Sequence, residues 1–383
     1  MSEYRSYKIG DNIVSPLGHS SKDVYEAVKR GKSMAKLHEH TFGLPEPFFG
    51  SLLDRERIDS LFLTLPDKKI RYTYFEKIAI LSAFCALEKL NIDPSRPDLF
   101  FVLSTTKGNI DLLENPDGFD KNRVDMSVSA QLIGQFFGNP NQVMVVSNAC
   151  TSGVAAQIYA DEKLKRSDKY KYAVVVGAEM LSKFVVSGFQ SFKALSPQRC
   201  KPFDKNRCGL NLGEAAATIV LEKSAEPIAG CLSILGTGNR NDANHISGPS
   251  RTGEGLFLSI QSALRSKNVE GRTLSFINAH GTATLYNDDM ESWAIFRSDF
   301  QNVPTNSLKG YFGHTLGAAG VLECILSGYA LQEKKILPTY GFDEAGTVKE
   351  ITVAQNLADS TRGDAFLKII SGFGGSNAAI IYG

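Results

Sequence analysis

The sequence lacks the features that would place it in several large classes of protein. Its 42 basic and 41 acidic residues give a net charge of +1, so no global excess of positive charge favours nucleic acid as a partner. No run of 18 apolar residues predicts a membrane span, and residues 1–30 contain no apolar core of a secretory signal. We therefore expect a cytoplasmic protein with neither a nucleic-acid nor a membrane partner.

Cysteine is too scattered to indicate a disulfide-stapled or zinc-bound domain. None of the six cysteines forms a C-x-x-C pair, and the zinc patterns H-E-x-x-H and H-x-x-E-H are absent. We therefore expect no metal site and no disulfide framework, which fits a reducing compartment. The 383 residues, of which 43% are hydrophobic and 22% charged, suffice for a sizeable core in one large or two medium domains.

Short apolar runs alternate with amphipathic helix patterns along the chain. This alternation predicts an α/β fold in which helices cover both faces of a sheet. Pro227 ends a charged segment, which places a boundary there between one half of residues 1–224 and another of residues 225–383. Strands are predicted at 7–16, 100–103, 143–146, 172–176, 218–221, 228–236, 275–279, 366–370 and 378–382, helices at 22–31, 74–90, 127–137 and 253–266, and loops with short helices at 32–66.

One predicted strand-to-helix turn carries a cysteine. Cys150 follows the apolar run 143–146 and precedes a helix pattern that continues past Gly153. Free N–H groups and the positive end of the helix dipole favour the thiolate there, and the thiolate is the nucleophilic form of cysteine. The alternative is that Cys150 is a small, unreactive core residue, and the turn alone does not separate the two interpretations.

Two glycine-flanked histidines lie in the second half. His280 follows the predicted strand 275–279, and His314 precedes a helix that runs through Glu323. A neighbouring glycine lets a ligand or another backbone approach closely, so two such histidines beside a cysteine turn indicate a site, although a single one would indicate a core residue. A cysteine hydrolase needs only one histidine, so the second one, and Lys309 shortly before His314, exceed that requirement.

Further short segments accompany these turns in a fixed order. They are Ala149-Cys150-Thr151-Ser152-Gly153, Pro202-Phe203-Asp204 with Arg207 and Gly209, Gly213-Glu214, Asn278-Ala279-His280-Gly281-Thr282 with Thr284, Asp288 with Glu291, Lys309 with Gly313-His314, Gly317-Ala318-Ala319-Gly320, and Gly372-Phe373-Gly374-Gly375-Ser376-Asn377. Together they resemble the β-ketoacyl-acyl-carrier-protein synthases of the elongating type, the condensing enzymes of fatty acid and polyketide synthesis. The resemblance covers nearly the whole chain. It implies a thiolase-like fold of two similar halves, each a mixed sheet covered by helices, in an αβαβα layering.

The resemblance also implies an activity. It is the decarboxylative Claisen condensation of an acyl group on Cys150 with malonyl on an acyl carrier protein, which gives a 3-oxoacyl carrier protein. His280 and His314 would assist decarboxylation, and no cofactor is implied because the phosphopantetheine arm arrives on the carrier. Supporting roles are implied for Thr282 and Thr284 at the phosphopantetheine arm, Lys309 and Glu323 in structuring the histidine site, Phe189 at the acyl pocket, and Phe373 as a gate whose N–H joins that of Cys150 in an oxyanion hole.

The partners that the resemblance implies are the carrier protein, acyl and malonyl thioesters, and a second subunit. A homodimer is typical, and a heterodimer with a chain-length partner is the alternative. Basic residues that match the carrier-docking regions are Lys68, Lys69, Arg71, Lys121, Arg123 and Lys193, and the alternative for each is a solvated surface charge.

Three features depart from the family pattern and concern pocket shape and carrier preference. Cys208 stands where an acid is usual, Lys193 stands where an arginine is usual, and the segment 285–287 (Leu-Tyr-Asn) is uncommon. Two other functions stay open. A non-catalytic chain-length partner typically lacks the nucleophile, whereas Cys150 is present, and a degradative thiolase using coenzyme A needs a second cysteine that residues 372–377 do not contain. The acyl length and the pathway are not indicated.

Overall fold

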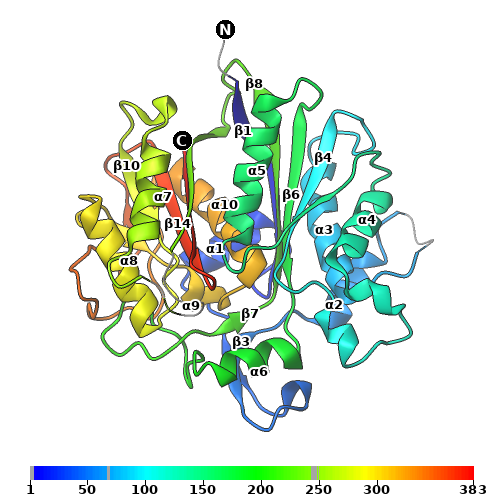
Figure 1. The fold of residues 1–383 in the computed structure, drawn as a ribbon, viewed down its shortest axis with the longest axis horizontal. Coiled ribbons are helices and arrows are strands. Elements are labelled where there is room, and N and C mark those ends of the chain that lie inside the picture. The colour runs from blue at the N-terminus through cyan, green and yellow to red at the C-terminus, as the bar shows by residue number, and fades with distance from the viewer. Residues whose placement is uncertain (1–3, 67–69, 243–247, 249) are drawn as a thin grey trace.

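The computed structural model describes residues 4–66, 70–242, 248 and 250–383. A mixed sheet of ten strands, in the order β11–β10–β14–β15–β9–β1–β8–β6–β4–β5, runs through the molecule (Figure 1). Its strands are β1 (Arg5–Val14), β4 (Leu99–Ser104), β5 (Met144–Val146), β6 (Tyr172–Glu179), β8 (Ala215–Ser224), β9 (Leu232–Asn241), β10 (Leu274–Asn278), β11 (Thr305–Asn306), β14 (Ala365–Gly372) and β15 (Ser376–Tyr382).

The sheet consists of two five-stranded parts that meet where β1 pairs with β9. The five strands on one side precede residue 225 and the five on the other follow it. β1 and β9 are antiparallel, with Tyr7 opposite Ser233 and Lys8 opposite Leu232. Each part combines parallel pairs, such as β4 with β6, and antiparallel pairs, such as β14 with β15. The division of the chain into two domains at residue 225 stays a prediction.

Helices lie on both faces of each part of the sheet. α5 (Ser152–Arg166) and α10 (Ala319–Gln332) contact each other and strands of both parts, so they form a central layer (Figure 1). α3 (Tyr74–Glu88) packs on the outer face of β1, β8 and β6, and α7 (Glu254–Leu264) packs on β9 and β15. The order helix, sheet, helix, sheet, helix is the predicted αβαβα layering, and it confirms the α/β, thiolase-like fold class.

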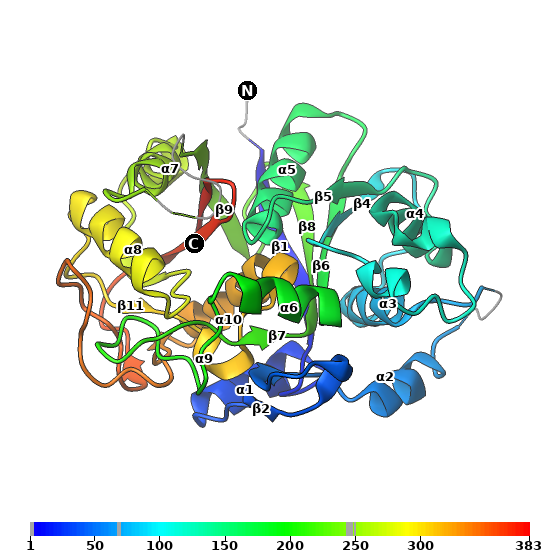
Figure 2. The same ribbon diagram turned by 60° about the horizontal axis from the view of Figure 1, so that its bottom comes forward.

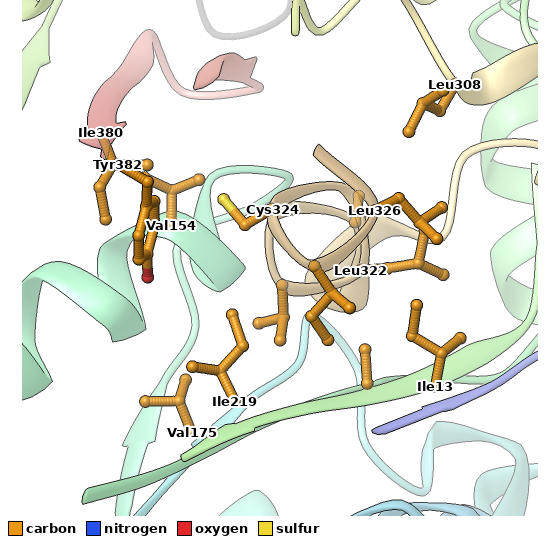
Figure 3. Packing of buried hydrophobic residues seen from close by; sticks show 14 of the residues in the cluster. Ile13, Val154, Val175, Ile219, Leu308, Leu322, Cys324, Leu326, Ile380 and Tyr382 are labelled. Carbon is orange, nitrogen blue, oxygen red and sulfur yellow. The ribbon is translucent and has the colours of Figure 1, made fainter. Parts of the chain in front are cut away.

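The centre of the core surrounds α10. Its residues are apolar and buried on nearly every side, which is typical of a helix enclosed by other elements. Figure 3 shows Leu322 and Leu326 of this helix among side chains such as Ile13, Ile219 and Ile380, which come from strands of both parts. The first turns of α5 and α10 approach each other so closely that a Cβ at position 153 would lie 2.9 Å from a backbone nitrogen of α10.

Several elements differ from the sequence-based predictions. Residues 32–66 contain the strands β2 (Lys36–His38) and β3 (Phe48–Ser51), which were not predicted, and α2 (Arg55–Phe62), which agrees with the short helices expected there. Helices α6 (Lys183–Ser191) and α8 (Leu285–Arg297) were not predicted either (Figure 2), and β9 begins at Leu232 instead of residue 228. The remaining helices and strands are α1 (Ser21–Lys29), α4 (Met126–Phe136), β7 (Leu212–Gly213), α9 (Lys309–Phe312), β12 (Lys335–Ile336) and β13 (Ala358–Asp359). Among the described residues, every helix is too short or too polar to cross a lipid bilayer.

Candidate active site

Cys150 lies in the turn between β5 and α5. Ala149 adopts a left-handed backbone conformation (φ 46°), and the hydroxyl of Thr151 donates a hydrogen bond of 2.7 Å to the carbonyl of Asn148. Thr151 is the N-cap of α5, so the cysteine directly precedes the helix, and only 8% of it is exposed. The thiol therefore occupies the predicted position at a helix N-terminus, inside the protein.

The structure brings Cys150, His280 and His314 together, although they are far apart in the sequence. His280 follows β10, and His314 follows α9. The two imidazole rings are nearly perpendicular, with centroids 4.9 Å apart. The sulfur of Cys150 and one ring nitrogen of each histidine all lie within 4.8 Å of one another. One small molecule can thus contact all three side chains.

Backbone contacts orient both histidines. The N–H of Leu316 donates to Nδ1 of His314 (3.3 Å), so the proton of a neutral ring resides on Nε2. The carboxylate of Glu291, on α8, accepts the N–H groups of His280 and Gly281, each at 2.7 Å. The position of His280 is therefore tied to a buried acid that belongs to a helix the sequence did not predict.

Three buried charges lie beneath the histidines. Nζ of Lys309 donates to Glu323 at 2.8 Å, and Nζ of Lys368 lies 2.5 Å from the other oxygen of the same carboxylate. Nζ of Lys368 also donates to the carbonyl of Ala279 (3.1 Å), directly before His280. At most 4% of any of these side chains is exposed, so the cluster carries a buried net charge of about +1.

The electrostatics keep both histidines neutral. Burial lowers the pKa of His280 and of His314 well below the ordinary value, and the positive charge of Lys309 lowers both further. A neutral imidazole carries one N–H donor, and in His314 the contact at Nδ1 places that donor on Nε2. The two histidines therefore act as hydrogen-bond donors without a positive charge.

The thiol of Cys150 differs from the sequence-based expectation. Burial raises its pKa to about 11, although Lys309, Lys107 and the backbone N–H of Phe373 act in the opposite direction. The resting site therefore holds a protonated thiol at neutral pH, because the loss of solvation outweighs the nearby lysines and the backbone N–H that favour a thiolate.

One cavity of about 580 Å³ contains Cys150, His280 and His314 and the residues predicted to bind the substrate, whereas Lys309 and Glu323 do not line it. Thr282 and Thr284 line it, with their hydroxyl oxygens 2.9 Å apart. Phe189, on α6, and Phe373 line it as well, and their ring centroids lie 5.9 Å apart. Further lining residues are Phe192, Lys193, Arg207, Cys208, Leu285, Tyr286 and Asn287, so all three departures from the family pattern border the cavity.

The predicted docking residues do not form one group. Lys193 lines the cavity, Lys121 is exposed, and Arg71 makes a surface ion pair with Asp117 (2.9 Å). Arg123 is a correction, because its guanidinium pairs with the fully buried carboxylate of Glu76 and only 12% of its side chain is exposed. Lys68 and Lys69 lie outside the described residues.

The sequence reasoning missed three residues of this region. Lys368 interrupts the apolar run of β14, and an ionisable residue in a buried strand was the available signal. Glu179, at the end of β6, accepts the N–H groups of Thr106 (2.8 Å) and Gly317 (2.9 Å) and joins the two halves beside the site. Phe192 follows α6 and contacts the ring of Phe373, and no sequence pattern indicated it.

Comparison with known proteins agrees with this geometry. The family model "Beta-ketoacyl synthase, N-terminal domain" matches residues 9–226, and "Beta-ketoacyl synthase, C-terminal domain" matches residues 232–343. The tetracenomycin polyketide synthase ketoacyl synthase alpha subunit of Streptomyces glaucescens is 31% identical over 352 residues, which cover 82% of each chain. The 3-oxoacyl-acyl-carrier-protein synthase 2 of Vibrio harveyi is 26% identical over 416 residues, or 100% of this chain and 99% of that one.

A solved structure shares the whole fold. The ishigamide ketosynthase/chain length factor superposes with a TM-score of 0.85 at 25% identity and covers 100% of this chain and 99% of that one. The N-terminal family model alone spans more than half of the chain. This protein therefore belongs to the β-ketoacyl synthases, the condensing acyltransferases of fatty acid and polyketide synthesis.

Proposed function

We propose that Cys150 carries the growing acyl group and that His280 and His314 act on the malonyl unit that extends it. The observation that carries this assignment is the meeting of the three side chains within 4.8 Å in one cavity. A thiol and two neutral N–H donors suit a reaction that forms first a thioester and then an enolate.

The first step transfers the acyl group to the enzyme. The sulfur of Cys150 attacks the carbonyl carbon of the acyl thioester, and the thiol proton passes to the departing pantetheine sulfur. The tetrahedral oxygen would lie between the backbone N–H groups of Cys150 and Phe373, and the latter already faces the Cys150 sulfur. One such donor contributes about 2.7–4 kcal/mol to transition-state stabilisation.

The second step forms the carbon nucleophile. The bond between the malonyl carboxylate and its methylene carbon breaks, CO2 leaves, and the electron pair moves into an enolate whose oxygen bears the charge. The N–H groups of His280 and His314 would donate to that oxygen, with the buried positive cluster of Lys309 and Lys368 behind them. A neutral donor does not protonate the enolate, so the carbanion survives until it meets the acyl group.

The third step forms the new carbon–carbon bond. The enolate carbon attacks the acyl carbon on Cys150, the carbon–sulfur bond breaks, and the departing thiolate takes up a proton from solvent water. The product leaves as a 3-oxoacyl thioester on the carrier, and Thr282 and Thr284 line the cavity where the phosphopantetheine arm would lie. We propose that the reaction uses no resident cofactor, because loss of CO2 generates the nucleophile.

Mass spectrometry of the intact protein tests the assignment. After incubation with an acyl carrier thioester, we expect one acyl group on Cys150, none on the Cys150→Ser variant, and an unchanged result for Cys208→Ser, which removes the exposed thiol of the same cavity. His280→Asn and His314→Asn should still become acylated but release less CO2 from malonyl carrier protein. Acylation of Cys208 in place of Cys150 would contradict the proposal.

We also propose that the protein functions as a dimer joined at β5. This strand ends the strand order of the sheet, so its outer edge pairs with no other described strand, and 38% of Met144 is exposed. An unpaired apolar edge strand is a template for a second chain. The relative from ishigamide synthesis is described with a chain length factor, so the second chain is a copy of this one or such a factor. Native mass spectrometry of the wild type and of Met144→Arg separates these outcomes.

The carrier protein is the proposed partner at the cavity mouth. Lys193 lines the cavity and Lys121 is exposed, and both would face the acidic surface that carrier proteins of this family present. We expect Lys193→Glu to raise KM for carrier-bound malonyl several-fold and to leave KM for malonyl on free pantetheine unchanged. An equal effect on both substrates would indicate a role inside the cavity instead of docking.

A further inference from the structure

The ring of Phe373 covers the cavity from the tip of a hairpin. Phe373 lies between β14, which ends at Gly372, and β15, which begins at Ser376. The next two residues, Gly374 and Gly375, have positive φ angles of 83° and 77°, and a Cβ at position 374 would meet no neighbouring atom within 4 Å. Residues with side chains rarely adopt such conformations, so the two glycines allow the tight turn that places Phe373 at the tip of the hairpin.

Among the described residues, the aromatic rings that contact Phe373 come from one helix and the turn that follows it. The ring stacks on Phe189 of α6, with a centroid distance of 5.9 Å and an interplanar angle of 26°. The ring of Phe192 meets it edge to face, at 5.5 Å and 62°. All three rings line the cavity that contains Cys150. The ring of Phe373 is therefore held from two sides.

Phe192 is an unusual residue in this arrangement. It is 61% exposed, so burial in the core does not explain a phenylalanine at this position. The next residue, Lys193, has a positive φ of 54°, a strained conformation for a residue with a side chain. The strained turn presents the Phe192 ring to the mouth of the cavity, where its aromatic contact is Phe373.

We infer that Phe192 is a positioning residue that holds the Phe373 ring closed over Cys150 and so limits access to the thiol and to its acyl ester. An edge-to-face aromatic pair changes an equilibrium constant by a factor of about 2 to 12. Loss of the Phe192 ring should therefore raise the fraction of molecules with an open cavity by a factor in that range. The effect on the bare thiol is independent of the proposed function, whereas the effect on the acyl ester rests on it.

Alkylation of Cys150 by iodoacetamide, followed by mass spectrometry, measures the open fraction. We expect Phe192→Ala to speed modification of Cys150 about 2- to 12-fold, and Phe192→Leu to have a smaller effect. Phe184→Ala is the matched control: Phe184 lies on α6, the helix that Phe192 follows, and is 51% exposed, but it is not among the cavity-lining residues. Both phenylalanines are exposed, so neither change should prevent folding, and circular dichroism checks this.

A double-mutant cycle distinguishes an effect of Phe192 through the Phe373 ring from a general increase in surface mobility. Phe373→Ala alone should speed alkylation at least as much as Phe192→Ala does. If Phe192 acts through the Phe373 ring, adding Phe192→Ala to Phe373→Ala should bring no further increase. Equal rates for Phe192→Ala, Phe184→Ala and the wild type, or additive effects in the double variant, would overturn the inference.

The acyl ester gives a second readout. Once Cys150 has been acylated, its thioester should be hydrolysed faster in Phe192→Ala than in the wild type, because water enters the open cavity. The factor should be similar to that expected for alkylation. If no variant becomes acylated but the alkylation rates differ as expected, the proposed function fails and the inference on Phe192 stands. If acylation is normal and alkylation does not change, the inference fails and the function stands.

Discussion

Replacement of Glu323 by glutamine should destabilise the protein far more than an ordinary loss of one charge. The carboxylate of Glu323 is shared by Lys309 and Lys368, and at most 4% of any of the three side chains is exposed. Removing one partner of a buried ion pair leaves an uncompensated charge, which costs about 3–5 kcal/mol. Two lysines lose the same carboxylate here, so we expect a loss near the upper end, about 4–5 kcal/mol, in the free energy of unfolding.

A rescue variant and a control variant make this expectation specific. Lys368→Met in the Glu323→Gln background removes one of the two stranded charges and should recover part of the loss. Glu162→Gln is the control, because Glu162 forms a surface ion pair with Arg166 at 3.5 Å, with 51% and 80% of the side chains exposed. Such pairs contribute about 0–1 kcal/mol, so the control should unfold close to the wild type.

Urea denaturation followed by fluorescence measures these free energies, and acid pH adds an independent check. Burial raises the pKa of Glu323, but Lys309 and Lys368 outweigh it and bring the pKa below the ordinary value. A carboxyl group with a lowered pKa stabilises the fold above its unfolded pKa and loses that contribution as the pH falls through its folded pKa. Below about pH 4.3 the unfolding free energy of the wild type should therefore fall through protonation of Glu323. Glu323→Gln lacks this carboxyl group and should not show that part of the fall. A Glu323→Gln variant within about 1 kcal/mol of the wild type at pH 7 would refute the argument.

Two further predictions concern packing and pH. A Cβ at Gly213 would lie 1.9 Å from the carbonyl oxygen of Phe312, so Gly213→Ala should lower the unfolding free energy by about 2 kcal/mol or more. At Gly188 a Cβ would meet no atom within 4 Å, so Gly188→Ala should stabilise α6 by about 0.5–1 kcal/mol. Urea unfolding distinguishes them, and equal stabilities would show that the backbone at residue 213 moves freely. Because the pKa values of His280 and His314 lie well below the ordinary value, both rings stay neutral, and the rate of malonyl decarboxylation should stay level from pH 8 to pH 6. A histidine of ordinary pKa would be only about one quarter neutral at pH 6, so a fall of that size would contradict the assignment.

The fold class could be predicted because its signals are local. The apolar run of β6 reflects burial on both faces of a sheet, and the largely apolar helix pattern of α3 reflects burial on most of its sides. Both patterns appear directly in the sequence. α8 was missed because its buried residues include Asp288 and Glu291, whose burial depends on partners elsewhere in the chain. β2 and β3 were missed because short strands in a segment rich in aromatic and proline residues carry little periodic signal.

The candidate site was predictable as a set of residues, but its electrostatics were not. A strand-to-helix turn marked Cys150, glycine-flanked turns marked His280 and His314, and the structure places all three in one cavity. Protonation states depend on burial and on charges from distant segments. Lys368, for example, reaches the site from β14, and Phe192 reaches Phe373 from the turn after α6. Arg123 shows the reverse case, since a basic residue that looked free in the sequence pairs with the buried Glu76.

The buried environment favours a different species at each stage of the proposed reaction. Loss of solvation raises the pKa of Cys150 and lowers those of both histidines, so before substrate binds the site contains a thiol and two neutral rings. If the site instead held a permanent thiolate beside two imidazolium ions, the thiolate would already neutralise those rings. The enolate would then have to displace it. In the neutral site, the negative charge that faces the buried cluster of Lys309, Glu323 and Lys368 arrives with the malonyl carboxylate and moves onto the enolate oxygen when CO2 leaves. The two histidine N–H groups therefore stabilise this charge where the proposed reaction develops it, at the enolate oxygen.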